Sequence, residues 1–341
     1  MPFSKPVLSE KLECAARRMC STLLAATVVS GCNAGTGGPT PAGPSASEVS
    51  PALQALLDKT RKNLRFIEGG SFQMGDFGPL HSPDKLYYSS SPDNKPLHKV
   101  TLDSFWMSAF KTTYADHDVY SAATGYPKVG TDGMTMEYRY PDGGAGLSWQ
   151  QAREYCQWLG QQLKLPMDLP TEAQWEFAAR NRGQFFVFAT DNGKVDAGRN
   201  VWEYDQRNAF IENYNAQHKL RYAGPSLPLG QFPPTPLGLY DMMTDGFEWI
   251  LDWYATDYYA DSPEKNPSGP ANGKEKVIRS FRSRDGDGLA YGDGLSFARG
   301  HREPNPAKVN YKGESTPDRN MNNATVARCV VNSSSPDVLA R

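Results

Sequence analysis

The 341-residue sequence has little excess charge, few cysteines and only a short apolar run near its N-terminus. Its formal net charge is −2, which leaves no electrostatic footprint for nucleic acid or for an anionic membrane surface. The apolar run, Leu23–Val29, is too short to span a bilayer as a stable anchor. We therefore expect no nucleic-acid partner and no stable membrane-spanning anchor.

Glycine, proline and aromatic residues are abundant instead. The chain contains 31 Gly and 26 Pro, and aromatic residues make up 11% of it. This composition is typical of a loop-rich domain with an aromatic core rather than of a helical bundle. Because no internal repeat and no second composition class are visible, we predict one domain over residues 63–332 and a tail over residues 333–341.

The N-terminus resembles a bacterial lipoprotein signal. Basic residues precede the run Leu23–Val29, and small residues lie between that run and Cys32. The resemblance implies a signal peptide over residues 1–31, lipidation of Cys32, and a flexible tether with a short helix over residues 32–62. Asn33 after the cysteine, rather than Asp, favours the outer membrane, with the domain facing the periplasm. The alternative is a cytosolic protein with an apolar N-terminal helix.

Residues 148–180 predict two short capped helices. Ser148 and Gln151 have the spacing of a capping box, and Thr171 and Gln174 repeat it. After each cap, apolar residues recur at helical spacing and give each helix a face to bury. Two prolines between the segments prevent a continuous helix, namely Pro166 and Pro170.

Other segments predict further elements. Residues 51–62 and 114–124 favour helices, because apolar residues recur there on one side. Residues 66–74 and 98–107 favour strands. Residues 181–236 show little periodicity, and the C-terminal part predicts short strands between long loops.

Three stretches resemble the formylglycine-generating enzyme family, also called sulfatase-modifying factors. They read Leu-Pro-Thr-Glu-Ala-Gln-Trp-Glu-Phe-Ala-Ala-Arg over residues 169–180, Gly-Leu-Tyr-Asp-Met-Met-Thr-Asp-Gly-Phe-Glu-Trp over residues 238–249, and Phe-Ile-Glu-Gly-Gly-Ser-Phe-Gln-Met-Gly over residues 66–75. The resemblance covers roughly residues 64–331. It implies an α+β fold, a variant of the C-type lectin architecture with little regular secondary structure.

The segment that corresponds to the family's catalytic segment contains no cysteine. Active members oxidise a substrate cysteine to formylglycine with oxygen, and they bind copper(I) through two closely spaced cysteines. A single thiolate cannot hold linear copper(I). Residues 277–288 contain no cysteine, and the chain after Cys32 has no other closely spaced pair. We therefore predict a catalytically degenerate domain that binds no copper.

A related branch of the family uses non-haem iron, which needs clustered histidines and open coordination positions. The five histidines here are scattered, without a His-x-His or His-x3-His pair. We expect no iron, and we interpret most histidines as surface or internally satisfied residues. His301 lies where the family's active-site segment ends, so it is the histidine of greatest interest.

Cys156 and Cys329 match the two cysteines that form the family's disulfide. Cys156 follows Glu-Tyr in the first capped helix, and Cys329 follows Ala-Arg near the end of the domain. The resemblance implies a bond between them, in an oxidising compartment where disulfides persist. The alternative is a pair of free thiols with a redox or metal role.

The resemblance also implies structural calcium. The corresponding ligands are the side chains of Asp241 and Glu248 and the backbone carbonyls of Thr244 and Gly246, which suit a hard cation. The alternative is an acidic turn that is satisfied by water and backbone amides. A second, less complete site would use the two neighbouring residues Asn200 and Val201.

The glycine-rich stretch at residues 285–293 departs from the family pattern and predicts a recognition loop. It is not an EF-hand, because Ala290 stands where Gly is required and Ser296 stands where Glu is required. The candidate recognition residues are Arg284, Asp285, Asp287, Asp293 and His301.

These observations predict a protein-binding module with a protein partner in the cell envelope, such as a secretion-system accessory or a toxin-immunity protein. The alternative is an oxidoreductase or protein-maturation enzyme with divergent metal chemistry. A third interpretation, carbohydrate binding, depends only on analogy with the lectin-like fold.

Overall fold

The computed structural model describes residues 50–131, 139–219, 227–280, 294–305, 307–309, 315–317 and 325–340. Residues 49–341 form one unit. The predicted signal peptide, Cys32 and the tether up to residue 49 lie outside the described residues, as do Arg284, Asp285, Asp287 and Asp293. Within the described part of the chain, no helix is long and apolar enough to cross a bilayer.

Two long strands were expected near the start of the domain, and each is divided into two. The four strands are β1 Leu64–Ile67, β2 Gly70–Met74, β3 His98–Leu102 and β4 Phe105–Ser108. β1 pairs with β4 and β2 pairs with β3, both antiparallel, so the ladder is interrupted at the same level on both sides. At Gly69 a Cβ atom would lie 2.3 Å from the carbonyl oxygen of Leu102. This close backbone approach requires glycine and explains why the predicted continuous strands were wrong.

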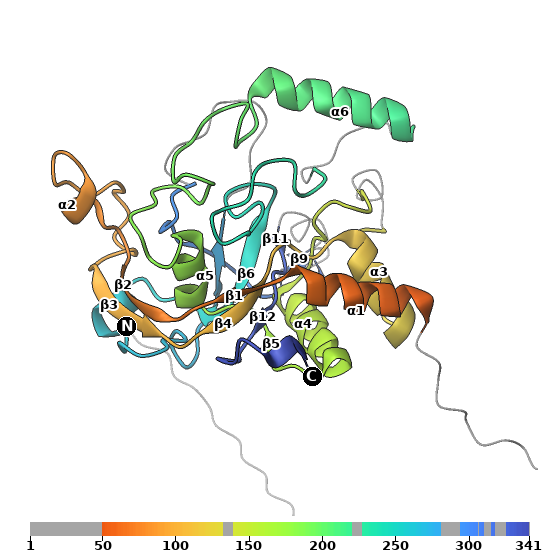
Figure 1. The fold of residues 1–341 in the computed structure, drawn as a ribbon, viewed down its shortest axis with the longest axis horizontal. Helices are drawn as coiled ribbons and strands as arrows, with labels where there is room; N and C mark the ends of the chain where they lie inside the picture. The colour runs from red at the N-terminus through yellow and green to blue at the C-terminus, as the bar shows by residue number, and fades with distance from the viewer. Residues whose placement is uncertain are drawn as a thin grey trace, which may run out of the picture. The chain divides into compact units, whose positions relative to one another are not determined.

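Two four-stranded sheets organise the rest of the domain (Figure 1). The first has the order β1-β4-β12-β5, and the second has the order β11-β6-β7-β8. Their remaining strands are β5 Met167–Asp168, β6 Phe247–Trp253, β7 Lys276–Arg279, β8 Gly300–Arg302, β11 Thr325–Val326 and β12 Val330–Val331. The C-terminal segment therefore supplies one strand to each sheet. A separate pair contains β9 Ala307–Val309 and β10 Ser315–Pro317.

Helices α1 Pro51–Asn63, α3 Tyr114–Thr124 and α4 Trp149–Leu163 lie side by side (Figure 1). α3 has the predicted bounds, and α1 extends one residue beyond its prediction. Both predicted capping boxes are confirmed, at the start of α4 and at the start of α5 Glu172–Ala179. The short helices are α2 Gly78–His81, α7 Tyr258–Asp261 and the 3-10 turn Val338–Ala340.

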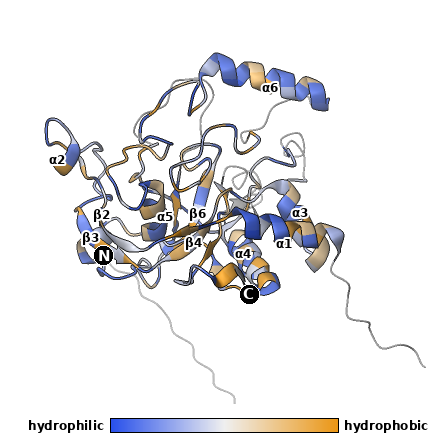
Figure 2. Cartoon of the chain, in the orientation of Figure 1, coloured by the Kyte–Doolittle hydropathy of each residue, from blue (hydrophilic) through white to orange (hydrophobic). Residues whose placement is uncertain are grey.

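Helix α6 Tyr204–His218 lies within residues 181–236, the stretch whose sequence shows little periodicity. Figure 2 shows hydrophilic residues on most of its surface, and Arg207 is its one buried residue. A helix without an apolar stripe produces no periodic signal in the sequence. Its Tyr214 hydroxyl donates a hydrogen bond of 3.0 Å to Asp142, so side-chain contacts attach it to the segment before α4.

Cys156 and Cys329, the pair that the resemblance implies, form a disulfide with their Cα atoms 5.5 Å apart. The bond joins α4 to the residue that precedes β12 and closes a sequence separation of 173 residues. Around it lies an apolar core that includes Tyr155, Leu159 and Trp249. A second core surrounds α5, with Trp175 only 1% exposed.

Candidate functional site

The candidate site consists of the residues on either side of the interval 281–293, in the region that the resemblance matches to the family's cysteine-bearing segment. β7 ends at Arg279, Ser280 follows with a φ of 72°, and the described chain resumes at residue 294. Both flanks of the interval 281–293 contact α5, the helix that carries the family-like signature. The chemistry of these contacts determines what the site can do.

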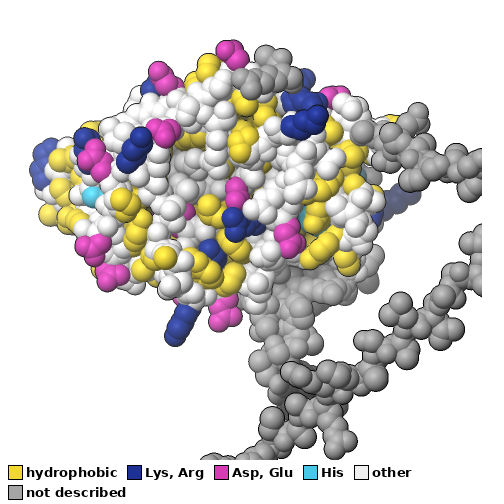
Figure 3. Space-filling model, turned by 90° about the horizontal axis from the view of Figure 1, so that it is seen from below, with side chains coloured by type: hydrophobic (Ala, Val, Ile, Leu, Met, Phe, Trp, Pro, Cys, Tyr) yellow, Lys and Arg dark blue, Asp and Glu magenta, His cyan; other side chains and the backbone are white. Residues whose placement is uncertain are grey.

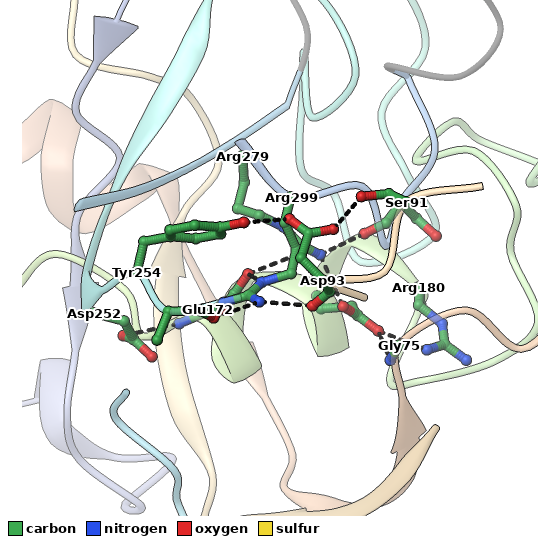
Figure 4. A network of polar contacts seen from close by, with 12 residues as sticks. Gly75, Ser91, Asp93, Glu172, Arg180, Asp252, Tyr254, Arg279 and Arg299 are labelled. Atoms are coloured by element: carbon green, nitrogen blue, oxygen red, sulfur yellow. Dashed lines mark hydrogen bonds and ion pairs between the residues drawn. The ribbon is translucent and has the colours of Figure 1, made fainter. Parts of the chain in front are cut away.

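Arg279 anchors the first flank. Its guanidinium donates to Oε1 of Glu172 at 3.0 Å and to Oε2 of Glu176 at 2.8 Å (Figure 4). It also donates to the carbonyl of Ser296 at 2.7 Å, which belongs to the other flank. The Arg279 and Glu176 side chains have no exposed surface, so this is a buried, charge-assisted connection.

Arg299 anchors the second flank. It forms a bidentate pair with Glu172, with distances of 2.8 and 3.0 Å. A further N–H donates to the carbonyl of Asp93 at 2.7 Å, so the segment before β3 is bound as well. Figure 4 shows these residues converging above α5.

Glu176 also binds the start of the domain. Its Oε1 accepts from the backbone N–H of Gly75 at 2.8 Å and from Arg180 at 2.8 Å. Arg180 donates in turn to the carbonyl of Gln73, at the end of β2. The signature glutamates therefore act as buried acceptors that hold separate segments together, which is a structural role.

The carboxyl group of Asp252 lies at the edge of this cluster. Its Oδ2 accepts from the backbone N–H of Glu172 at 3.1 Å (Figure 4). Burial, followed by the nearby charge of Glu172, raises the pKa of Asp252 to about 8. A buried carboxyl beside a carboxylate is thereby kept protonated at neutral pH.

His301 lies on β8, at the solvent-exposed edge of this cluster of ion pairs. Its Nδ1 is 2.8 Å from Oε2 of Glu275, and its side chain is 43% exposed. The imidazole ring stacks on Tyr254, with centroids 4.1 Å apart. The Tyr254 hydroxyl donates to Asp93 at 2.9 Å. The predicted recognition residue His301 is thus accessible and belongs to a small polar and aromatic surface next to the second flank.

The predicted calcium ligands at residues 241–248 are brought together, but their oxygens have partners within the chain. The carbonyls of Thr244 and Gly246 accept from Nζ of Lys111 at 2.5 and 2.6 Å. Both carboxylate oxygens of Glu248 accept from Arg328, each at 2.9 Å. Calcium binding at this turn stays a prediction, and these contacts bear directly on it.

The second predicted calcium pair is also hydrogen-bonded internally. The side-chain oxygen of Asn200 accepts from the N–H of Asp196 at 2.8 Å, and the carbonyl of Val201 accepts from the N–H of Gly198 at 2.8 Å. In the described ranges, no three His, Cys, Asp or Glu side chains are grouped so as to hold a metal ion.

Several residues of the site were not predicted from the sequence: Lys111, Glu172, Glu176, Arg279, Arg299 and Arg328. Lys111 and Arg328 lie far in sequence from the turn that they bind, so no local sequence pattern predicts these contacts. The glutamates and Arg180 recur every four residues in the signature, a spacing that places them on one helix face. That spacing was the one available signal.

We expect the Glu176→Gln variant to lose about 3–5 kcal/mol of unfolding free energy, because it leaves the buried guanidinium of Arg180 without its counter-charge and removes one of the two that face Arg279. Urea unfolding followed by tryptophan fluorescence measures this loss. The matched control is Glu264→Gln, which removes one partner of the exposed pair with Lys99 and should change stability little. Equal losses in the two variants would contradict the structural role of Glu176.

We expect the contribution of Asp252 to the unfolding free energy to fall as the pH rises from about 4 to about 8, because its pKa is raised to about 8 in the folded state and lies near 3.9 when unfolded. That contribution is complete below the unfolded pKa and is lost as the pH rises through the folded one. Between these pH values the wild type should therefore lose more unfolding free energy, or gain less, than Asp252→Asn. A residual slope should remain, because burial and Asp245 raise the pKa of Asp241 to about 7. An unchanged slope in Asp252→Asn would refute this assignment.

The Sulfatase-modifying factor enzyme 1-like domain matches residues 54–333 of the chain. The chain is 26% identical over 259 residues to the formylglycine-generating enzyme of Bos taurus, which covers 62% of this chain and 63% of that enzyme. It is also 26% identical over 240 residues to the inactive C-alpha-formylglycine-generating enzyme 2 of Bos taurus, which covers 56% of this chain and 71% of that protein. The chain thus spans less than two thirds of the length of the bovine formylglycine-generating enzyme.

Among solved structures, PvdO from Pseudomonas aeruginosa superimposes with a TM-score of 0.55 at 22% identity, covering 79% of this chain and 93% of that one. At this identity the likeness shows the fold alone, and it confirms the expected α+β class. The matched residues, the signature helix and the fold lead to one conclusion: the chain belongs to the sulfatase-modifying factor enzyme 1-like domain family.

Proposed function

We propose that this chain is a non-catalytic family member that binds a protein partner in the cell envelope. The observation that carries the proposal is the distribution of its cysteines. Between Cys156 and Cys329 the sequence contains no cysteine, and these two are joined in a disulfide. No thiolate is therefore available in residues 277–288, where the family resemblance places copper(I) chemistry that needs two of them.

The contacts of α5 support the binding role. Glu172 and Glu176 fix the two flanks of the interval 281–293 through buried ion pairs. A domain with these ion pairs and without the thiolates holds both flanks of the interval 281–293 in place and lacks the groups that the oxidation needs. The bovine relative whose name describes it as inactive supports the view that such a domain persists without the reaction.

We assign recognition to residues 281–293, which the sequence predicts to form a loop, and to the neighbouring surface around His301 and Tyr254. The contacting residues would be Arg284, Asp285, Asp287, Asp293 and His301. His301 is the member of this set with an observed exposed position, next to Tyr254. On the face seen in Figure 3, acidic and basic side chains are interspersed with apolar ones.

The proposal places the domain on the outer membrane, facing the periplasm, and attached through lipidated Cys32. The partner class that we favour is a secreted or periplasmic protein, with the chain as a secretion-system accessory or as an immunity protein that blocks a periplasmic toxin. This choice follows from the predicted location and from analogy within the family.

The competing function is an oxidoreductase or protein-maturation enzyme with different metal chemistry around His301. The contact between His301 and Glu275 is the observation that favours it, since a carboxylate commonly orients a metal-binding imidazole. Copper or iron bound at one equivalent per chain would favour this enzyme over the binding module.

We expect no catalysed oxidation of cysteine by this protein. The purified domain would be incubated with copper(I), oxygen and a cysteine-containing sulfatase-motif peptide, and the peptide mass followed over time. The bovine formylglycine-generating enzyme provides the positive control. Formylglycine production above the rate without protein would contradict the proposal.

We expect the partner to be captured from envelope extract by the wild-type protein and lost in a variant with Arg284→Ala, Asp285→Asn, Asp287→Asn and Asp293→Asn. The matched control changes the exposed Lys99 and Glu264 pair, which lies on β3 and in the loop after α7. Mass spectrometry identifies the partner, and size-exclusion chromatography of the purified pair tests a 1:1 complex. Equal capture by both variants would show that the loop is not the recognition surface.

A further inference from the structure

Lys111 lies where the family resemblance implies a calcium ion. Its side chain has no exposed surface, and its Nζ donates to the carbonyls of Thr244 and Gly246 at 2.5 and 2.6 Å. Nζ is also 3.8 Å from Oε1 of Glu248. Three of the four predicted calcium ligands therefore face one ammonium group.

The backbone of the turn at residues 241–248 adopts unusual φ angles close to the Lys111 ammonium group. Asp241 and Asp245 have positive φ angles of 57° and 60°, and Gly246 has a φ of 104°. Such conformations are unfavourable for non-glycine residues unless surrounding contacts fix them. Two carbonyl dipoles that converge also need a positive charge between them, and Lys111 supplies it.

The other oxygens of the turn leave little room for a metal ion. Glu248 accepts from Arg328 through both oxygens and from the indole of Trp175 at 2.9 Å. Oδ2 of Asp241 accepts from the N–H of Gly230 at 2.9 Å. Oδ2 of Asp245 is the one buried side-chain oxygen of the turn without a hydrogen-bond partner, whereas calcium takes six to eight oxygen ligands.

A divalent ion at this position would also lie beside two positive groups, Lys111 and Arg328. The turn and calcium therefore do not fit together while Lys111 is present. We propose that the Lys111 ammonium is a built-in substitute for calcium, so that the turn at residues 241–248 holds its structure without a metal ion. This inference goes beyond the proposed function and does not depend on it.

Lys111 belongs to the chain, so it links the turn to other elements of the domain, which a bound ion at the same position would not do. Lys111 follows β4 in sequence, so its hydrogen bonds to the carbonyls of Thr244 and Gly246 connect the end of the first sheet to the turn before β6. Its Nζ is also 3.5 Å from Oγ of Ser280, the first residue after β7. One side chain therefore connects the first sheet, the turn and the near flank of the candidate site.

The wild-type protein provides the first test. Its melting temperature should be the same in millimolar CaCl2 and in EGTA, and titration calorimetry with CaCl2 should give no stoichiometric binding. A lower melting temperature in EGTA, or one equivalent of bound calcium, would overturn the proposal.

The Lys111→Ala variant provides the second test, because it opens a space lined by the same oxygens. It should be less stable than wild type, and saturating CaCl2 should raise its melting temperature by several degrees. A rise of that size is expected when the calcium concentration is about 100 times the dissociation constant of a single site. Lys111→Met is the matched control. It should also be destabilised, without a response to calcium, because its side chain fills the space of the ion.

Adding Asp241→Asn to Lys111→Ala should remove the calcium response. If Lys111→Ala folds, as judged by circular dichroism, and does not respond to calcium, the turn is not a cation site and the proposal is wrong. If that variant does not fold, the wild-type measurement decides the question alone.

Discussion

Buried ion pairs between three glutamates and five basic side chains hold this domain together. Glu172, Glu176 and Glu248 are at most 2% exposed. Their partners are Arg180, Arg279, Arg299, Arg328 and Lys111. A buried charge without a partner is costly, so each of these segments is constrained to the position where its charge is matched. Several of these ion pairs join segments that are more than a hundred residues apart in sequence, such as Glu172 and Arg299, in a chain with modest regular secondary structure.

This arrangement separates the family signature from the family chemistry. The glutamates of the signature helix bind the flanks of the segment where the resemblance places copper-binding cysteines, and this chain makes those contacts without the cysteines. The signature sequence therefore indicates that the chain has the family's fold and does not indicate that it has the family's activity. In the turn at residues 241–248, a lysine occupies the point where the resemblance implies a metal ion. In both places, side chains of the chain itself supply the positive charge.

Much of the local structure was predictable from the sequence because its causes are local. The capping boxes at Ser148 and Thr171 and the bounds of α3 follow from caps and periodicity within a few residues. The family and the α+β class followed from three short motifs. The two split strands were missed because the break depends on backbone contact across the hairpin at Gly69. Helix α6 was missed because its few apolar residues form no stripe along one face, and Lys111 was missed because its acceptors lie more than a hundred residues away.

We propose a non-catalytic scaffold in which the Lys111 ammonium takes the place of the calcium ion that the family resemblance implies. Metal analysis by inductively coupled plasma mass spectrometry, on full-length protein purified without chelator, tests it most directly. The account predicts calcium, copper and iron each far below one equivalent per chain. One equivalent of copper or iron would contradict the non-catalytic role, and one equivalent of calcium would contradict the assignment of Lys111.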